Sequence, residues 1–334
     1  MPEKPYSPPY TVTDVIIHLI AEISEQVGAI TIKNETALSP KLRRENQIKT
    51  IHSSLAIENN SLSLEQVTDL INGKRVRGAQ NEIREVKNAF KAYKLLFRFD
   101  PYNVEDMLKA HKLLMTNLTN DAGHFRSGGA GIFAGKLLVH MAPPAKSVPK
   151  LVKNLVNWVR LTDAHPLIKS CVFHYEFEFI HPFSDGNGRM GRMWQTLLLS
   201  HWKPLFAWLP VETLIRERQQ EYYDVLASAD NAADSTAFVE FMLCALRDAL
   251  KELLQTEQVR EQVTVQVEKL LTAIGRDTLS ARELLARLGL KHRPTFANTY
   301  LRPALELRLI EMTLPDKPNS NKQKYRAVKQ NGGS

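Results

Sequence analysis

The chain has 334 residues, is 43% hydrophobic and 24% charged, and carries a formal net charge of +8. These values are typical of a globular protein with a sizeable core. The two cysteines, Cys171 and Cys244, lie in apolar helical surroundings, which argues against a disulfide framework and favours a reducing compartment. No apolar run is long enough for a transmembrane helix and the N-terminus lacks a signal-peptide pattern, so we expect a cytoplasmic protein without membrane contact. The basic charge permits an anionic partner, nucleotide or nucleic acid, without identifying it.

Helical periodicity dominates the first 120 residues. Apolar residues recur at helical spacing, and Gly73 and Pro101 mark places where helices end. The expected helices span residues 11–30, 40–58, 63–73, 80–99 and 104–118.

The pattern breaks between residues 120 and 149. Five glycines lie close together there, a Pro143-Pro144 pair follows, and the segment GIFAGKLLVHMAP alternates loosely like a short hairpin. Helices are expected again at residues 149–161, 166–180, 189–201, 211–228 and 236–255.

The last part of the chain changes character. Residues 257–334 hold 14 Lys and Arg against 8 Asp and Glu, so most of the excess positive charge lies there. A capping box from Ser280 to Glu283 opens a short helix, which Gly289 ends. The third helix of this region, at 293–308, precedes a polar strand-turn-strand. Three helices followed by such a wing are typical of a winged helix-turn-helix. We therefore divide the chain into residues 1–79, 80–255 and 256–334.

The third helix of this winged helix suggests a DNA-binding surface. Other winged helices bind proteins or dimerise, so a protein contact or a homodimer stays open, as does presentation of target proteins. The candidate contact residues are Arg293, Thr295, Asn298, Thr299 and Arg302.

The segment from His181 to Arg192, HPFSDGNGRMGR, lies between two helical stretches and carries the chemistry. A Gly-Asn-Gly turn at 186–188 followed by a helix start can form an anion nest suited to phosphates. Arg189 and Arg192 are three residues apart, so both can reach that nest. Asp185 is a carboxylate beside the phosphate site, where Mg²⁺ would be held, and His181 can take a proton from an attacking hydroxyl.

This segment is similar, without a gap, to the signature of the Fic family. The resemblance implies protein adenylylation, the transfer of AMP from Mg-ATP to a protein Ser, Thr or Tyr hydroxyl. It makes His181 the general base and Asp185 the ligand of the Mg²⁺ that bridges the α- and β-phosphates. The remaining residues of the motif are expected to contact the nucleotide, and among them Arg192 would pair with the γ-phosphate: Gly186, Asn187, Gly188, Arg189, Met190, Gly191 and Arg192.

The resemblance extends beyond the motif. Residues 128–137, with the Pro-Pro pair downstream, resemble the family's flap, which pairs like a strand with a target segment; its named residues are Gly131, Ile132, Phe133 and Ala134. The Tyr222-Tyr223 pair resembles aromatic residues that wall the adenine pocket, and Tyr223 is the expected contact. Some relatives have asparagine where Asp230 stands, so this position departs from the family pattern.

An N-terminal segment, Ser54 to Asn59, resembles the family's inhibitory motif. A helix ending near Asn59 would present Glu58 as an anionic tip, and Arg192 is its expected partner. A Glu58–Arg192 pair would occupy the place that the γ-phosphate needs and leave bound ATP poorly aligned. The alternative is a solvated glutamate at a helix end.

The expected fold is an all-α Fic core with a small hairpin flap, followed by a winged helix. Its partners would be ATP and a protein substrate with an accessible hydroxyl. Two rival functions stay open. The first stays within Fic chemistry: the enzyme would use another nucleotidyl or phosphoryl donor, or would remove AMP. The second is a DNA-binding regulator whose Fic domain senses a ligand. His174 and His181 are spaced seven apart, but without a third ligand at helical spacing His174 is expected to be a core residue, as is Cys171.

Overall fold

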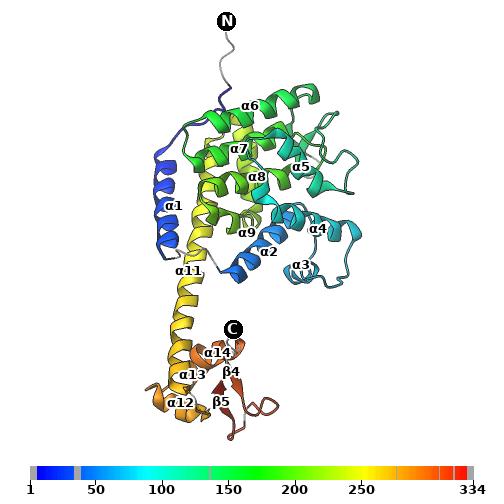
Figure 1. Cartoon of the computed structure of the whole chain (residues 1–334). Coiled ribbons are helices and arrows are strands. Elements are labelled where there is room, and N and C mark those ends of the chain that lie inside the picture. The colour runs from blue at the N-terminus through cyan, green and yellow to red at the C-terminus, as the bar shows by residue number, and fades with distance from the viewer. Residues whose placement is uncertain are drawn as a thin grey trace. The chain divides into compact units, whose positions relative to one another are not determined.

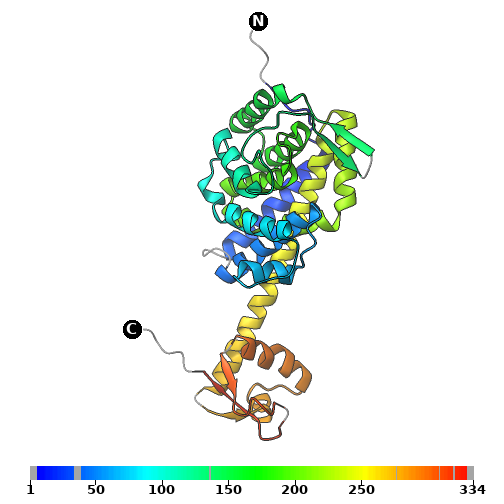
Figure 2. The same cartoon turned by 90° about the vertical axis from the view of Figure 1, so that its right-hand side faces the viewer.

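The computed structural model describes residues 6–33, 39–134, 137–275, 277–307, 309–318 and 320–328. Within these ranges, the side chains of residues 32–33, 132–134, 137–140 and 257–264 are not described. The chain divides into two compact units, residues 1–251 and 252–334. Each unit is described by itself (Figures 1 and 2).

The N-terminal helices of the first unit confirm the predicted order. They are α1 (Asp14–Lys33), α2 (Pro40–Ile57), α3 (Leu64–Ile71), α4 (Gln80–Lys94) and α5 (Val104–Met115), with a 3-10 turn, η1 (Leu96–Arg98), between the last two. Ser39 caps α2 and Pro40 stands at its first position, where a missing N–H costs nothing. Ser63 and Gln66 form a capping box that opens α3. These local signals explain why the helix starts could be predicted closely.

The middle of the first unit is built around two buried helices. A two-stranded hairpin, β1 (Gly131–Ala134) and β2 (Leu137–Met141), is followed by the 3-10 turn η2 (Ala145–Ser147), α6 (Val148–Leu161), α7 (Pro166–Ile180) and α8 (Asn187–Trp202). Helix α7 is buried on nearly every side, and it packs against α8 (Figure 1). Phe173 and Phe177 of α7 belong to the main core together with Met190 and Trp194 of α8. The loop between these two helices therefore starts and ends on rigid elements.

Two predicted helix boundaries after α8 are wrong. The expected helix at 211–228 is two helices, α9 (Val211–Glu217) and α10 (Gln219–Ala232), which follow the 3-10 turn η3 (Pro204–Trp208) and break at Arg218. The helix expected at 236–255 continues as α11 (Thr236–Ile274). No Gly or Pro occurs between Thr236 and Ile274, so nothing in the sequence ends the helix before Gly275. The change in charge near residue 256 therefore does not coincide with a break in the helix.

The second unit contains the predicted helices and strands together with one additional strand. Its elements after α11 are β3 (Leu279–Ser280), α12 (Ala281–Arg287), α13 (Arg293–Phe296), η4 (Ala297–Leu301), α14 (Arg302–Glu306), β4 (Ile310–Met312) and β5 (Lys324–Ala327). The three strands form an antiparallel sheet in the order β3-β5-β4. The expected third helix is interrupted by the π turn η4, because Pro303 has no N–H to donate and its ring crowds the carbonyl of Thr299. Leu284, Phe296 and Tyr325 lie in the core of this unit.

Across the described residues, no helix is both long and apolar enough to cross a membrane.

Candidate active site

The loop between α7 and α8 forms the centre of the candidate site. His181 caps α7 in the left-handed conformation (φ 47°), a backbone state that non-glycine residues seldom adopt. Asn187 closes the loop, because its side chain accepts a hydrogen bond from the Phe183 N–H (2.8 Å) and donates one to the Phe183 carbonyl (2.9 Å). The side chain of Asn187 thus holds the loop closed, and its backbone lies at the first position of α8.

Gly186 allows the turn into α8. Its φ is +83°, and a Cβ at this position would lie 2.7 Å from the sulfur of Met115. The carboxylate of Asp185 accepts hydrogen bonds from the Gly186 N–H (2.6 Å) and from Nη2 of Arg189 (2.9 Å), while its side chain keeps 60% of its surface exposed. Asp185 is therefore aimed at solvent directly beside the N-terminus of α8, where the helix dipole attracts anions.

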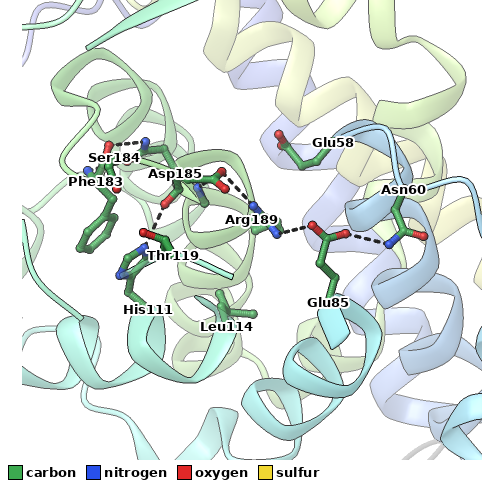
Figure 3. Close-up of polar contacts among 12 residues, drawn as sticks. Glu58, Asn60, Glu85, His111, Leu114, Thr119, Phe183, Ser184, Asp185 and Arg189 are labelled. Carbon is green, nitrogen blue, oxygen red and sulfur yellow. Dashed lines mark hydrogen bonds and ion pairs between the residues drawn. The ribbon is translucent and has the colours of Figure 1, made fainter. Parts of the chain in front are cut away.

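Arg189 is held between two carboxylates although its side chain is only 6% exposed. Nη2 donates to Asp185 on its own helix, and Nη1 donates to Glu85 of α4 at 3.2 Å. The other oxygen of Glu85 accepts a hydrogen bond from Asn60 at 2.7 Å (Figure 3). The sequence predicts Arg189 at the phosphates, but nothing in its pattern indicated Glu85 or Asn60.

Glu58 lies against the N-terminus of α8. A Cβ built on Gly188 would come within 2.2 Å of Oε1 of Glu58, so the absence of a side chain at this position makes room for the carboxylate. Figure 3 shows the carboxylate directed toward the motif from the end of α2. Glu58 thus fills the place at which the sequence predicts an incoming anionic phosphate.

The end of α2 determines where Glu58 points. The helix closes with a Schellman motif, in which the Asn60 N–H bonds to Leu55 and the Asn59 N–H bonds to Ala56. Asn59 adopts the left-handed conformation (φ 68°) that this motif requires, and Glu58 is the capping residue. The predicted helix end near Asn59 is confirmed, and it places Glu58 at the helix tip.

The predicted contact between Glu58 and Arg192 is present. Nη2 of Arg192 donates to Oε1 of Glu58 at 2.7 Å and to the Ser54 carbonyl at 2.9 Å, while Nε donates to the Ser54 hydroxyl at 3.0 Å. The Arg192 side chain is 2% exposed. Burial acts to lower the pKa of Arg192, but Glu58 and other acidic neighbours raise it overall, so the guanidinium stays charged.

Two further buried carboxyl groups surround Arg192. Burial raises the pKa of Glu178 on α7 to about 8 and that of Glu212 on α9 to about 7. In both cases the charge of Arg192 opposes this rise. His174, as predicted, is a core residue; it is bonded to Gln195 and Tyr222, and burial lowers its pKa to about 3. Arg192 is therefore accompanied by buried polar side chains, Glu178, Glu212 and His174, that the sequence pattern did not indicate as a group.

His111 of α5 holds the α7–α8 loop through a ring contact and a hydrogen bond. Its ring stacks on Phe183 with centroids 3.6 Å apart. Nδ1 accepts a hydrogen bond from the Gly123 N–H (2.9 Å), so Nε2 carries the proton and donates to the Asp185 carbonyl (3.0 Å). Burial lowers the pKa of His111, consistent with a neutral ring. An isolated histidine on a helix offered no sequence signal for this role.

Arg126 joins the flap to the motif. Its buried guanidinium donates to the carbonyls of His181 (2.7 Å), Gly128 (2.8 Å) and Pro143 (2.5 Å). Gly128 and Pro143 lie on either side of the β1–β2 hairpin, so one side chain ties both ends of the flap to the candidate base. No sequence signal indicated this role for Arg126.

The predicted flap residues and Tyr223 lie outside the α7–α8 loop. Gly131, Ile132, Phe133 and Ala134 form β1 of the expected hairpin, and the side chains of the last three lie outside the description. Tyr223 lies on α10, and its pKa is raised by burial and then by the charge of Glu58.

Met190 points into the core and Gly191 faces Glu178 and His174 of α7, so neither offers a side chain to a nucleotide. Asp230 accepts a hydrogen bond from the Tyr175 hydroxyl at 2.9 Å.

The donor set at Asp185 fits Mg²⁺ carried in with a nucleotide. Mg²⁺ in nucleotide sites keeps several waters and needs only one or two protein carboxylates besides the phosphate oxygens. Asp185 is an exposed carboxylate beside the anion nest, and the described residues show no cluster of three metal-binding side chains that could hold an ion without a nucleotide. When bound, the ion would neutralise phosphate charge.

The fold and the α7–α8 loop define a Fic-type helical protein with a small C-terminal domain. Residues 101–199 match the model of the Fic/DOC family, and residues 265–327 match that of the Fic-like C-terminal domain, described as filamentation induced by cAMP protein Fic-like. A crystal structure of a Fic family protein from Desulfovibrio desulfuricans G20 is 57% identical, covers 98% of this chain and 100% of its own, and superposes with a TM-score of 0.76. The chain belongs to the Fic family.

More distant relatives carry functional names. Protein adenylyltransferase Fic of Aedes aegypti is 27% identical over 233 residues, which are 66% of this chain and 44% of the relative. The chain thus spans less than half the length of that relative. A Fic domain containing signaling protein from Bacteroides thetaiotaomicron covers 71% of this chain and 95% of its own at 18% identity and a TM-score of 0.56, which shows the shared fold.

Proposed function

We propose that the protein is an adenylyltransferase that moves AMP from Mg-ATP to a Ser, Thr or Tyr hydroxyl of a target protein or of itself, and that Glu58 inhibits it. The observation that carries this proposal is the anion nest at the start of α8, which lies beside His181 and Asp185 and is filled by Glu58. The names of the distant relatives support the same reaction.

The proposed reaction is an in-line displacement at the α-phosphorus. His181 takes the proton of the acceptor hydroxyl, the hydroxyl oxygen forms a bond to the α-phosphorus, and the bond from that phosphorus to the bridging oxygen breaks to release pyrophosphate. Arg189 and the first N–H groups of α8 would stabilise the phosphates. The protein contributes mainly orientation and charge neutralisation.

Glu58 would act on ATP alignment. With Arg192 bonded to Glu58, the γ-phosphate lacks its cation, and the carboxylate adds negative charge where that phosphate should lie. ATP would then bind with its α-phosphorus out of line with the acceptor hydroxyl.

Incorporation of labelled ATP tests the proposal. The Glu58→Gly variant should label itself and proteins of a lysate strongly, and addition of His181→Ala should reduce labelling by roughly 10²–10⁴-fold. A parallel panel of ATP labelled in the adenine ring or at the γ-phosphate, GTP, CTP and UTP distinguishes the donor and the group transferred. Transfer from another donor with none from ATP, or full activity without His181, would refute the proposal; so would release of AMP from a labelled target without any transfer.

A second candidate function concerns the C-terminal unit. Its third helix, the residues just before that helix and the hairpin expose several cations, whose charge complements the phosphates of duplex DNA: Lys291, Arg293, Arg302, Lys317, Lys322 and Lys324. Arg293→Ala should weaken binding of a random-sequence duplex, measured by fluorescence anisotropy at several salt concentrations, more than Lys269→Ala on α11 does. Absence of saturable binding at low salt would favour a protein partner instead.

A further inference from the structure

Glu85 makes two polar contacts that the proposed reaction has not used. This residue lies on α4, outside both the α7–α8 motif and the segment that carries Glu58. Its Oε1 accepts a hydrogen bond from Nη1 of Arg189 at 3.2 Å, and its Oε2 accepts one from Nδ2 of Asn60 at 2.7 Å. Only 20% of the Glu85 side chain is exposed. A glutamate on a helix surface is usually solvated, so a carboxylate with both oxygens engaged and little exposure has a specific structural role.

The two ends of the Arg189 guanidinium face different partners. Nη1 meets Glu85, whereas Nη2 meets Asp185, the exposed carboxylate beside the anion nest. Glu85 therefore holds the guanidinium at one terminal nitrogen and leaves the other directed toward the place where phosphates would bind (Figure 3). Glu85 contacts Arg189 only through the nitrogen that is turned away from the nest. The arrangement is that of a support for Arg189.

Asn60 connects this support to the inhibitory segment. Its backbone N–H completes the Schellman motif at the end of α2, and its side chain also donates to the Glu82 carbonyl (3.2 Å). Its Oδ1 accepts a hydrogen bond from the Leu62 N–H (3.2 Å). The turn that positions Glu58 is thus fastened to α4, and Glu85 is the group that reaches from this turn to the phosphate cradle.

We propose that Glu85 is a positioning residue for the nucleotide phosphates: it holds Arg189 in the cradle and ties this arginine, through Asn60, to the turn that follows Glu58. This inference rests on the proposed function, because it takes Arg189 to contact the phosphates of ATP. Arginine recognises phosphate through a planar set of donors, so the orientation of its guanidinium decides how many hydrogen bonds it can form. An unsupported guanidinium would turn away from the nest for part of the time, and ATP would bind more weakly.

The test measures Mg-ATP affinity in the full chain carrying Glu58→Gly, by calorimetry with a non-hydrolysable ATP analogue. Adding Glu85→Gln keeps the size of the side chain but removes its charge, and should raise the Kd about tenfold, the effect of one charge-assisted hydrogen bond. The matched control is Glu82→Gln, one turn earlier on α4, where an exposed carboxylate accepts a hydrogen bond from the Ser61 N–H. This control removes the same charge from the same helix and should change the Kd less than twofold.

A second variant and a kinetic readout separate positioning from a loss of folding. Asn60→Ala leaves the Glu85–Arg189 pair in place and removes its tether, so the Kd should rise about threefold, less than with Glu85→Gln. In the labelling assay, Glu85→Gln should raise KM while kcat stays within about twofold, because His181 and the acceptor are untouched.

Two failures can be told apart. If the parent chain with Glu58→Gly binds the analogue but Glu85→Gln binds it equally well or more tightly, the positioning role is refuted and the proposed function stands. If the parent does not bind the analogue in the presence of Mg²⁺, the proposed function fails, and the inference fails with it. Should Glu85→Gln not fold, an unchanged Kd in Asn60→Ala would still refute the link to the turn.

Discussion

The charge competition at Arg192 leads to the sharpest prediction. Glu58→Gly should raise AMP transfer strongly, and Arg192→Ala should cancel that gain. Arg192 is almost fully buried and donates to Glu58 at 2.7 Å, and the Glu58 side chain is 31% exposed. A charge-assisted hydrogen bond of this kind contributes roughly 1.5–3 kcal/mol. Its transfer from Glu58 to a γ-phosphate in the transition state would change the rate on the order of 10–100-fold.

The structure adds a reason why Arg192 should be ready for the phosphate. Ser54 receives two of its hydrogen bonds, from Nε and Nη2, and these bonds do not involve the Glu58 carboxylate. The guanidinium should therefore keep its place when Glu58 is removed. Gly188, which now faces the Glu58 carboxylate, would then lie open to the phosphates.

The assay is autolabelling of four proteins at saturating Mg-ATP: the unsubstituted chain, each single variant and the double variant. If the two residues act through one shared charge, their effects are non-additive, and the double variant is nearly as inactive as Arg192→Ala alone. Glu58→Gln serves as an isosteric control and should also activate, since it removes the charge with little change in shape. Equal labelling of the unsubstituted chain and Glu58→Gly would refute the inhibitory role. A highly active double variant would instead indicate that loosening of α2 causes the gain.

Three further predictions concern the metal, pH and folding. Asp185→Asn should weaken ATP binding roughly tenfold with Mg²⁺ but little in EDTA, measured by calorimetry; an equal loss in both would assign its effect to Arg189. The pKa of Glu178 is raised by burial to about 8, so the folded chain binds a proton more tightly than the unfolded chain, and the associated stability falls as pH rises from about 4.5 to 8. Glu178→Gln should therefore unfold in urea with a smaller loss of stability between pH 6 and 9, by on the order of a few kcal/mol, and an unchanged pH slope would contradict this origin. Arg126→Ala leaves several buried carbonyls without a donor, so we expect Tm to fall by roughly 5–10 °C in calorimetric scans, whereas an unchanged Tm would show that the flap is anchored elsewhere.

Arg192 interacts with carboxyl groups from three helices of this site. Glu58 contacts it from α2, while Glu178 and Glu212 act on it electrostatically from α7 and α9. Because burial favours the protonated forms of Glu178 and Glu212, Glu58 is the group that meets Arg192 as a directly bonded carboxylate. Removal of Glu58 is therefore expected to leave a cation whose next anionic partner comes from the nucleotide.

Much of the local structure followed from the sequence alone. The Ser280–Glu283 capping box and the end of the short helix at Gly289 depend on neighbouring residues, and both are present. The motif residues lie within one loop and the first turns of one helix, so their proximity needed no knowledge of the fold. The pairing of Glu58 with Arg192 crosses 134 residues, and it was reached only because both segments resemble those of a known family.

Tertiary packing decided which ordinary residues serve the site. Glu85 and Arg189 are 104 residues apart, and a glutamate on an amphipathic helix has the same sequence pattern whether it faces water or a buried arginine. Arg126 gains its role because two ends of a flap and the end of α7 present their carbonyls to one guanidinium. The pKa values of Glu178 and Glu212 depend on burial by helices distant in sequence, because desolvation is set by what surrounds a group in space and not by its neighbours along the chain.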